Sequence, residues 1–416
     1  MTDAGKKIGF YCWAGPGTVR MTDLKFFRPK KDVPSLMGSY EYEYLAEIRE
    51  KFGVTDFWAT WSWGFSDATE GPDRKFLEER IGNFRRAGIR VHAYVQGPNL
   101  VAAQFPGKDY WCRDERGRTI PYHRGRLVCC PNKPAYRKLL LGRVVRAARC
   151  GADGVFMDNV QVGKLGVPFL GGKTVPFAGC ACADCRAKFR RDTGREIPLR
   201  PDAPTEDVRA WYAWRLKVSA DLLREAADLV HREGKLFGSN SFDPLFPTKY
   251  CYGTDIAETV KIQDYVLFEN LRLPRGRQGN ADLAPVIAKL PPGKDVFVVS
   301  YKRGIGHDAQ WAQADVDRIF TEADALGFIP CLKGSEFFTR GRWHNLRPQR
   351  YVAPRPVAKF KPYGSKSGGG TMRRLVLKVP GVRGLLARHS AALLSRFFEN
   401  RALRAAFRRL ESLLMR

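Results

Sequence analysis

Cysteines and carboxylates are the residues of this chain whose types and spacing predict chemistry. Residues 180–185 read Cys-Ala-Cys-Ala-Asp-Cys, which puts three thiols at metal-ligand spacing, and Cys130 supplies a fourth thiol upstream. Four thiolates suit a closed tetrahedral zinc site, which leaves the metal no open coordination position. The cysteines therefore predict a structural metal site rather than a catalytic one.

Two acids at the ends of short apolar runs are the best candidates for catalysis. Asp158 follows Val-Phe-Met, and Glu269 follows Leu-Phe. An acid in such a place is costly to bury without a function or a partner. Two carboxylates that face one cavity can cleave a glycosidic bond, one as nucleophile or charge stabiliser and the other as general acid. We assign the first role to Asp158 and the second to Glu269; the alternative is that both form salt bridges with Lys302 or Arg303.

Further polar and aromatic residues lie in or just after the same kind of apolar run, where a barrel enzyme would contact its substrate. For His92 the alternative is an interior histidine that is hydrogen-bonded within the protein. The candidates for substrate binding are Trp61, His92, Tyr94, Asn159, Asn240, Tyr301 and Lys302.

The elements that must position these residues alternate regularly along the chain. Short apolar runs with little internal alternation, typical of strands buried on both faces of a parallel sheet, are separated by helical patterns. The runs are 8–13, 54–63, 89–96, 154–159, 236–242, 265–271, 296–301 and 328–333. Eight such units predict an α/β fold, a (β/α)8 barrel over residues 1–340. A doubly wound open sheet is the alternative, but no Gly-x-Gly-x-x-Gly follows a strand.

Charge and composition change toward the C-terminus. Residues 341–370 form a basic, glycine-containing linker, and 371–416 place apolar residues at helical spacing among arginines, with Glu399 and Glu411 as the acids. This segment is either a basic amphipathic helix on an anionic membrane or partner, or a helix packed on the barrel. The formal net charge of +28 favours an acidic partner such as an anionic glycan or membrane. No nucleic-acid-binding motif accompanies the charge, so nucleic acid is not the expected partner.

The termini and the cysteine content indicate a compartment. The first residues lack the apolar core of a signal peptide, and no uncharged stretch reaches the length of a membrane span. In the cytoplasm the 10 cysteines stay reduced, which favours a metal over disulfides. We therefore expect a cytoplasmic protein, with peripheral membrane attachment through 371–416 as an option.

The stretch 129–189 resembles the zinc-containing β-galactosidases of glycoside hydrolase family 42 and related hypothetical glycosyl hydrolases. Three pieces match in order and at similar spacing: Cys-Pro-Asn-Lys-Pro-Ala-Tyr-Arg from Cys130, then Asp-Asn from Asp158, then the cysteine run that ends four residues before Phe189. The resemblance covers about sixty residues of the chain. It implies that the four thiols bind a structural zinc on the rim of the barrel, with Cys130, Cys180, Cys182 and Cys185 as ligands.

The chain departs from this family at the catalytic residues. Val160 stands where the family has its acid/base glutamate, and Ser300-Tyr301-Lys302 ends the strand that carries the family's nucleophile. β-Galactosidase activity is therefore not implied. Acids on the fourth and sixth strands look more like the barrels that include α-galactosidases, by position alone. The sequence thus predicts a glycoside hydrolase acting on a carbohydrate, and the alternative is a non-catalytic glycan-binding barrel docked to a membrane or to polysaccharide-assembly partners by its basic tail.

Overall fold

A computed structural model shows how the predicted elements assemble. The tail segments 341–370 and 371–416, together with Tyr301 and Lys302, lie outside the residues that it describes. The described residues are 7–11, 15–18, 20–21, 37–123, 125–163, 179–199, 203–242, 244–245, 248–269, 271, 273, 280–281, 283–299 and 313–333.

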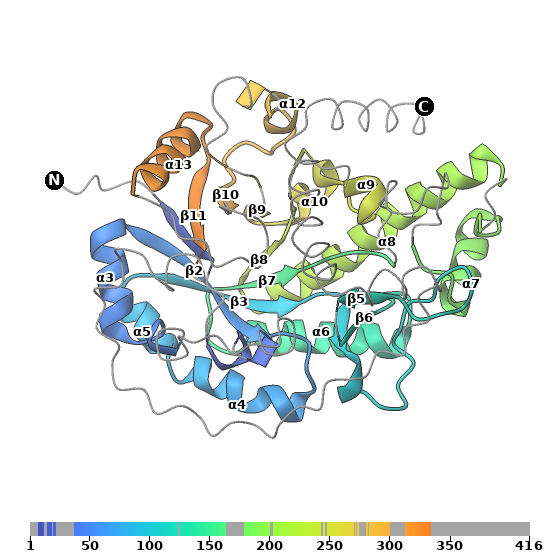
Figure 1. Ribbon diagram of the computed structural model, residues 1–416, viewed down its shortest axis with the longest axis horizontal. Helices are drawn as coiled ribbons and strands as arrows, with labels where there is room; N and C mark the ends of the chain where they lie inside the picture. Colours follow the sequence, from blue (N-terminus) through green and yellow to red (C-terminus); the bar gives the residue numbers. More distant parts are fainter. Residues whose placement is uncertain are drawn as a thin grey trace, which may run out of the picture.

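Eight parallel strands form a barrel, and each corresponds to one of the eight predicted runs (Figure 1). In spatial order the sheet reads β8-β7-β3-β2-β1-β11-β10-β9. The predicted (β/α)8 fold is therefore confirmed. The strands are β1 (Ile8–Tyr11), β2 (Val54–Ser62), β3 (Arg90–Gln96), β7 (Gly154–Asp158), β8 (Leu236–Ser239), β9 (Val266–Glu269), β10 (Val296–Val299) and β11 (Ile329–Lys333).

The ring is nearly closed between β8 and β9, the strands at the two ends of this order. Directly after β8, Asn240 forms an isolated parallel bridge to Leu267 of β9. The amide of Ser241 donates to the carbonyl of Leu267 at 2.9 Å, and the amide of Asn240 donates to the carbonyl of Met157 at 3.3 Å. The backbone of Asn240 therefore joins β7 to β9 at the carboxyl end of the barrel.

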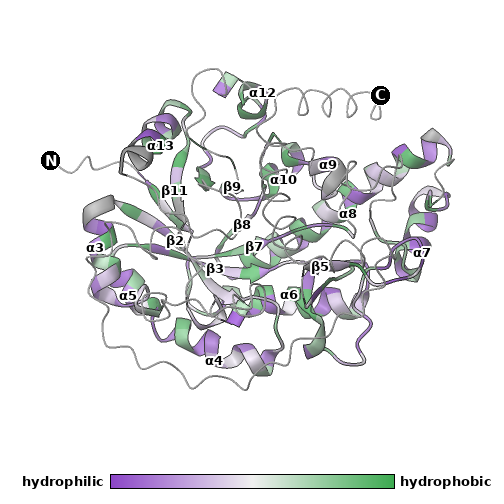
Figure 2. Ribbon diagram, viewed as in Figure 1, coloured by the Kyte–Doolittle hydropathy of each residue, from purple (hydrophilic) through white to green (hydrophobic). Residues whose placement is uncertain are grey.

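Helices surround the strands and carry both hydrophobic and hydrophilic residues, as α3 and α4 show in Figure 2. Two consecutive helices lie between β2 and β3, and the first begins after Ser66, whose hydroxyl accepts a hydrogen bond from the amide of Thr69. The helices are α3 (Tyr42–Phe52), α4 (Asp67–Glu78), α5 (Ile81–Arg86), α6 (Pro134–Ala148), α7 (Ala183–Thr193), α8 (Thr205–Arg232), α9 (Thr248–Cys251), α10 (Ile256–Ile262), α12 (Ala284–Ile287) and α13 (Gln313–Ala325). No helix among the described residues is long and apolar enough to cross a membrane.

Aromatic side chains fill the inside of the barrel. Trp58 stacks on His92 with ring centroids 4.9 Å apart, and it meets Phe297 edge-on at 4.9 Å. Tyr11 contacts Phe156 in the same way at 5.9 Å. The interior is thus a packed core, and only the ends of the strands remain for a site.

An insertion between β3 and α6 was not expected from the sequence. It forms a second sheet of three short antiparallel strands, β4 (Asn99–Val101), β5 (Pro121–His123) and β6 (Arg126–Val128), in the order β4-β6-β5. Strands of three residues leave too little periodicity to detect. Figure 1 shows β5 and β6 between the barrel and α7. The insertion therefore follows β3 at the carboxyl end of the barrel and leads directly into Cys130.

Candidate functional site

Asp158, the last residue of β7, is held by several hydrogen-bond donors. Its side chain is buried, and it accepts bonds from the Tyr94 hydroxyl, from the Asn159 backbone amide at 2.7 Å and from Asn159 Nδ2 at 2.6 Å. Asn240 Nδ2 donates to Asp158 Oδ1 at 2.7 Å. A carboxylate can accept all of these bonds, whereas a protonated acid would direct one hydrogen at a donor. The donor set therefore matches an ionised Asp158.

Asn240 joins the two candidate carboxylates. The same Nδ2 that donates to Asp158 also donates to Glu269 Oε2, and Glu269 is buried with 5% of its surface exposed. The opposite side of the amide is fixed, because Asn240 Oδ1 accepts a bond from the backbone amide of Phe242 at 2.7 Å. This second bond determines which end of the amide faces the acids. Asp158 and Glu269 are therefore neighbours across a single amide nitrogen.

This arrangement limits the separation of the two acids. Two oxygens that are each within hydrogen-bond distance of one nitrogen lie at most about 6 Å apart. Carboxyl groups of retaining glycosidases are about 5–5.5 Å apart, and those of inverting enzymes are about 6.5–9.5 Å apart. The nearest oxygens of Asp158 and Glu269, Oδ1 and Oε2, are therefore close enough for a retaining pair.

Tyr94 on β3 and Gly97 just after this strand position Asp158. Burial, together with the negative charge of Asp158, raises the pKa of Tyr94 well above its ordinary value, so the phenol remains a hydrogen-bond donor. Just after the strand, the amide of Gly97 donates to the carbonyl of Asp158 at 2.8 Å. A Cβ at Gly97 would lie 2.1 Å from that carbonyl oxygen, so only glycine permits this approach. The ends of β3 and β7 are thereby held together beside the acids.

The prediction for Trp61 is wrong. Its ring packs outside the barrel with the helix-facing core, and the guanidinium of Arg74 lies 4.2 Å from its centroid. The register of β2 against β3 shifts between Thr60 and Ser62, as at a β-bulge, so the simple alternation of faces breaks at this point. Trp63 faces the interior instead and contacts Tyr94 with centroids 4.7 Å apart.

His92 does not join the other candidates. It pairs with Gly154, the first residue of β7, whereas Gln96 pairs with Asp158 at the other end of the strand. Four residues of strand correspond to about 13 Å. His92 Nε2 lies 3.0 Å from Asp56 Oδ1, and both side chains are buried. The structure thus gives His92 the interior role that was the alternative to substrate binding.

The remaining substrate candidates divide into two groups. Tyr94, Asn159 and Asn240 lie together around Asp158. Tyr301 and Lys302 are outside the described residues. Tyr122 of the insertion belongs to the site, because its hydroxyl donates to Asn159 Oδ1 at 2.5 Å. Nothing in its sequence context distinguishes Tyr122 from other loop tyrosines, so it was missed.

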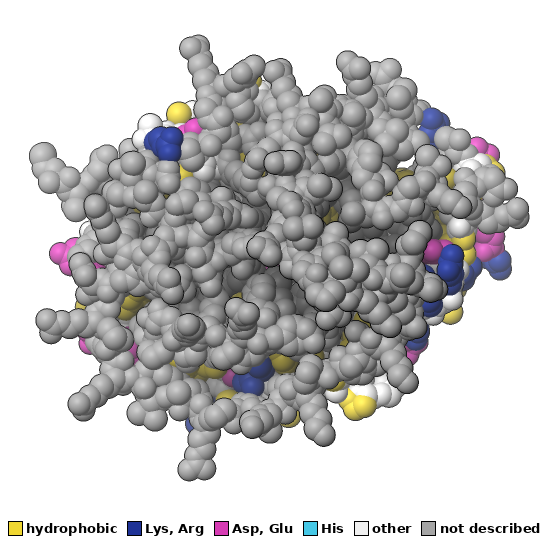
Figure 3. Space-filling view, viewed as in Figure 1, with side chains coloured by type: hydrophobic (Ala, Val, Ile, Leu, Met, Phe, Trp, Pro, Cys, Tyr) yellow, Lys and Arg dark blue, Asp and Glu magenta, His cyan; other side chains and the backbone are white. Residues whose placement is uncertain are grey.

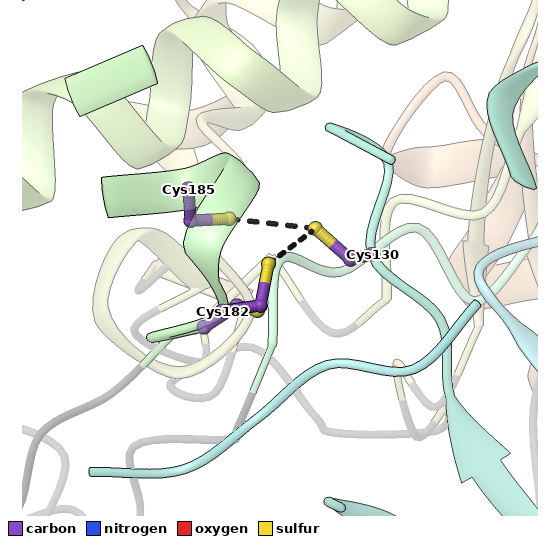
Figure 4. A group of neighbouring side chains, drawn as sticks. Cys130, Cys182 and Cys185 are labelled. Atoms are coloured by element: carbon purple, nitrogen blue, oxygen red, sulfur yellow. Dashed lines mark hydrogen bonds between the residues drawn. The ribbon is translucent and has the colours of Figure 1, made fainter. Parts of the chain in front are cut away.

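Four cysteines form a second buried cluster beside the insertion. We call Cys130, Cys180, Cys182 and Cys185 the four-cysteine site; their sulfur atoms all lie within 4.8 Å of one another. Cys130 Sγ is 3.4 Å from Cys185 Sγ and 3.6 Å from Cys182 Sγ (Figure 4). Sulfurs bound to one zinc at about 2.3 Å in a tetrahedron would be about 3.8 Å apart. The cluster therefore fits a metal ion, with small adjustments of the side chains.

Neighbouring groups are arranged as they are around thiolate ligands. Asn132 Nδ2 donates to Cys185 Sγ at 3.3 Å, and the backbone amide of Arg113 donates to Cys180 Sγ at 3.4 Å. Such N–H groups stabilise negative sulfur and fix the orientation of the ligands. Cys129 instead packs in the core around the barrel, which explains why only Cys130 of this adjacent pair joins the site.

Cys112 is a fifth buried thiol beside this cluster and was not predicted. It packs in the same core as Cys130 and Cys180. Burial raises the pKa of Cys112. The pKa values of Cys130 and Cys180 are lowered instead, and the hydrogen bond that each makes with Cys112 is the largest cause. Its sequence context, Trp-Cys-Arg, contains no metal-ligand spacing, so only the fold brings Cys112 to the cluster.

Basic side chains near this cluster are balanced by acids. At the right-hand edge of Figure 3, where Figure 1 places α7, basic and acidic side chains lie side by side. Lys188 Nζ is 2.9 Å from Asp192, and Arg195 pairs with Asp207. Basic and acidic side chains are therefore paired on the described surface at α7.

The comparisons with known proteins support the fold. A β-galactosidase from the Antarctic haloarchaeon Halorubrum lacusprofundi superposes with a TM-score of 0.50 at 16% identity, over 71% of this chain and 50% of that one. A β-galactosidase from the psychrophilic Marinomonas ef1 gives 0.53 at 12% identity, over 79% and 54%. This chain thus covers about half the length of each enzyme. No protein-family model and no curated protein matches the sequence. The chain therefore has the barrel fold of these glycosidases, at identities that carry the likeness no further.

Proposed function

We propose that this chain is a glycoside hydrolase that cleaves its substrate with retention of configuration. The observation that carries the proposal is the single amide nitrogen of Asn240 that bonds both Asp158 and Glu269. The separation of at most about 6 Å that follows suits a nucleophile and an acid/base on either side of one glycosidic bond. Similarity to two β-galactosidases makes a carbohydrate substrate the natural class for the fold.

Asp158 is the proposed nucleophile. Several neutral donors favour its ionised form, and they also orient its two oxygens. In the first step an oxygen of Asp158 attacks the anomeric carbon and forms a glycosyl ester, while the bond to the leaving oxygen breaks. Tyr94 and the two asparagines then hold the ester carbonyl in place.

Glu269 is the proposed acid/base. In the first step its proton goes to the leaving oxygen; in the second, the resulting carboxylate takes a proton from the water that hydrolyses the ester. Its burial at the end of β9, behind Phe268 and Leu267, favours the neutral form before reaction. The amide of Asn240 donates to Glu269 Oε2 and helps to orient the carboxyl group.

For the four-cysteine site we propose a structural zinc ion. Four buried thiols at tetrahedral spacing leave no open position, so the metal would have no direct part in catalysis. Bound there, it would tie the segment around Cys130 to the start of α7.

For the substrate we keep the expectation from the sequence, which is an anionic glycan. This expectation comes from the net charge, and Lys302 and Arg303 lie outside the described residues. Attachment of 371–416 to an anionic membrane is likewise a proposal from charge alone.

The test compares the wild type with Asp158→Asn and Glu269→Gln on a panel of 2,4-dinitrophenyl α- and β-glycosides, including uronides. Asp158→Asn should lose about a thousandfold or more in kcat, because no ester can form. Glu269→Gln should retain more activity on these substrates, because dinitrophenolate leaves without protonation, and added azide should restore turnover as the glycosyl azide.

A matched control is Asp228→Asn, which changes an exposed aspartate on α8. Turnover by Asp158→Asn at the wild-type rate would remove the nucleophile and with it the mechanism. Binding of oligosaccharides without cleavage by the wild type would instead favour the glycan-binding alternative.

A further inference from the structure

Tyr122 contacts the candidate active site through Asn159. Its hydroxyl donates to Asn159 Oδ1 at 2.5 Å, and Asn159 Nδ2 donates to Asp158 Oδ2 at 2.6 Å. The two bonds use opposite ends of one amide. With the phenol in place, a rotated amide would direct its NH2 group at the phenol oxygen and its carbonyl at a carboxylate. Tyr122 therefore stabilises the orientation in which Asn159 donates to Asp158.

The backbone conformation of Asn159 also has to be held by its surroundings. Its φ of 54° lies in the left-handed region, which asparagine tolerates better than most residues but which carries a cost outside glycine. The turn directs the backbone amide at Asp158 Oδ1, at 2.7 Å, and the side chain at Oδ2. Both donors of one residue thus depend on a conformation that the surroundings must hold.

The insertion anchors Tyr122 from the side of the four-cysteine site. Tyr122 packs against the core that contains Cys112, Cys130 and Cys180. Just before it, the Ile120 amide donates to the carbonyl of Cys112 at 3.2 Å. The Ala181 amide donates to the carbonyl of Arg113 at 2.7 Å, which joins this segment to the cysteines. The segment that carries Tyr122 is therefore packed on the four-cysteine site.

We propose that Tyr122 is a positioning residue that sets the acidity of Asp158 by fixing the Asn159 amide, with the four-cysteine site as its anchor. This inference rests on the proposed function only for its consequence in catalysis. The described titratable groups around Asp158 and Tyr122 include Tyr94 on β3, Glu269 on β9 and Tyr252, with buried Arg126 on β6 near both Tyr94 and Tyr122. Burial and the charge of Asp158 raise the pKa of Tyr122, which keeps its hydroxyl a donor.

The direct test is a pH titration of Asp158, monitored by NMR in protein labelled with carboxyl-13C aspartate. The Asp158 signal is assigned by its loss in Asp158→Asn. In Tyr122→Phe the midpoint of the Asp158 titration should rise by about one pH unit. This is the size expected when the Asn159 amide turns and its hydrogen bond to the Asp158 carboxylate is lost. Tyr110→Phe is the matched control. It removes a phenol oxygen from the same insertion, where the Tyr110 ring contacts Phe105 and Tyr136, and it should leave the midpoint unchanged.

A second variant covers the case in which Tyr122→Phe perturbs folding. Asn159→Gly removes the amide, and glycine accepts the positive φ; adding Tyr122→Phe to it should move the Asp158 midpoint no further. Metal content by mass spectrometry should be equal in all variants. The acidic limb of kcat/KM on a 2,4-dinitrophenyl glycoside should follow the NMR midpoint.

The outcomes separate the two proposals. An unchanged Asp158 midpoint in Tyr122→Phe, or an equal change in Tyr110→Phe, would overturn the role of Tyr122 whatever the activity. A raised midpoint together with full turnover by Asp158→Asn would support the role of Tyr122 and refute the glycosidase mechanism.

Discussion

The two ends of the barrel hold buried acids in different ways. At the amino end, Asp56 lies 2.9 Å from Arg90 and 3.0 Å from His92, and Thr55 donates to it at 2.7 Å. At the carboxyl end, the donors to Asp158 and Glu269 include the Tyr94 phenol and the side-chain amides of Asn159 and Asn240. Removal of one partner from a buried ion pair is strongly destabilising, whereas two buried carboxylates close together at the ends of barrel strands are typical of a site for chemistry. The difference indicates a structural end and a chemical end.

Removal of the proposed zinc should give the largest effect and should affect the carboxyl end alone. A metal present at about a thousand times its Kd contributes about 4 kcal/mol to the free energy of unfolding. After chelation, hydrogen exchange measured by mass spectrometry should accelerate in 110–130 and 179–189 and stay slow in 54–62. Cys130→Ser should reproduce this, and Cys150→Ser, which changes a cysteine outside the four-cysteine site, should not. Equal acceleration at both ends would contradict the division.

Asp56→Asn should give the next largest effect, in stability rather than activity. Loss of one partner leaves buried His92 and the nearby guanidinium of Arg90 without their carboxylate, which costs about 3 kcal/mol. Urea unfolding measures this change, and kcat on the best substrate should remain near the wild-type value. Asp228→Asn serves as the exposed control. A large fall in kcat with unchanged stability would mean that the amino end takes part in the chemistry.

Lowering the pH should reveal the same difference between the two ends of the barrel, with a smaller effect on the free energy of unfolding. Burial alone raises the pKa of Asp56, but the hydrogen bond and charge of His92 and the charge of Arg90 outweigh it and lower that pKa. A lowered folded-state pKa contributes stability above the unfolded value of about 3.9, and this is lost as the pH falls through the folded value. Between pH 5 and pH 3 the wild type should therefore lose about 1 kcal/mol more than Asp56→Asn. Parallel losses in urea titrations at the two pH values would argue against the ion pair.

Local sequence patterns were sufficient for the barrel and for the cysteine ligands. All eight apolar runs became strands, because strands buried on both faces must be apolar throughout. The three cysteines of 180–185 were recognisable from their metal-ligand spacing; in the structure Cys182 is the N-cap of α7 and Cys185 lies on its first turn. The candidate acids were recognisable because each ends an apolar strand.

Position within a strand did not decide which side chains meet. The register of β2 is irregular after Thr60, and Trp61 packs outside the barrel; His92 lies at the opposite end of its strand from the candidate site. Periodicity gives the face of a side chain only while the register is regular.

Local composition and spacing were enough to predict the fold class, the four clustered cysteines and the two candidate acids. Tertiary structure alone decided that one amide of Asn240 contacts both acids, that Tyr122 reaches Asn159 and that Cys112 joins the cysteines. These contacts join strands and loops that are distant in the chain; the Asn240 pairs alone span 82 and 29 residues. Closure of the barrel brings such residues together, and no local pattern records that closure.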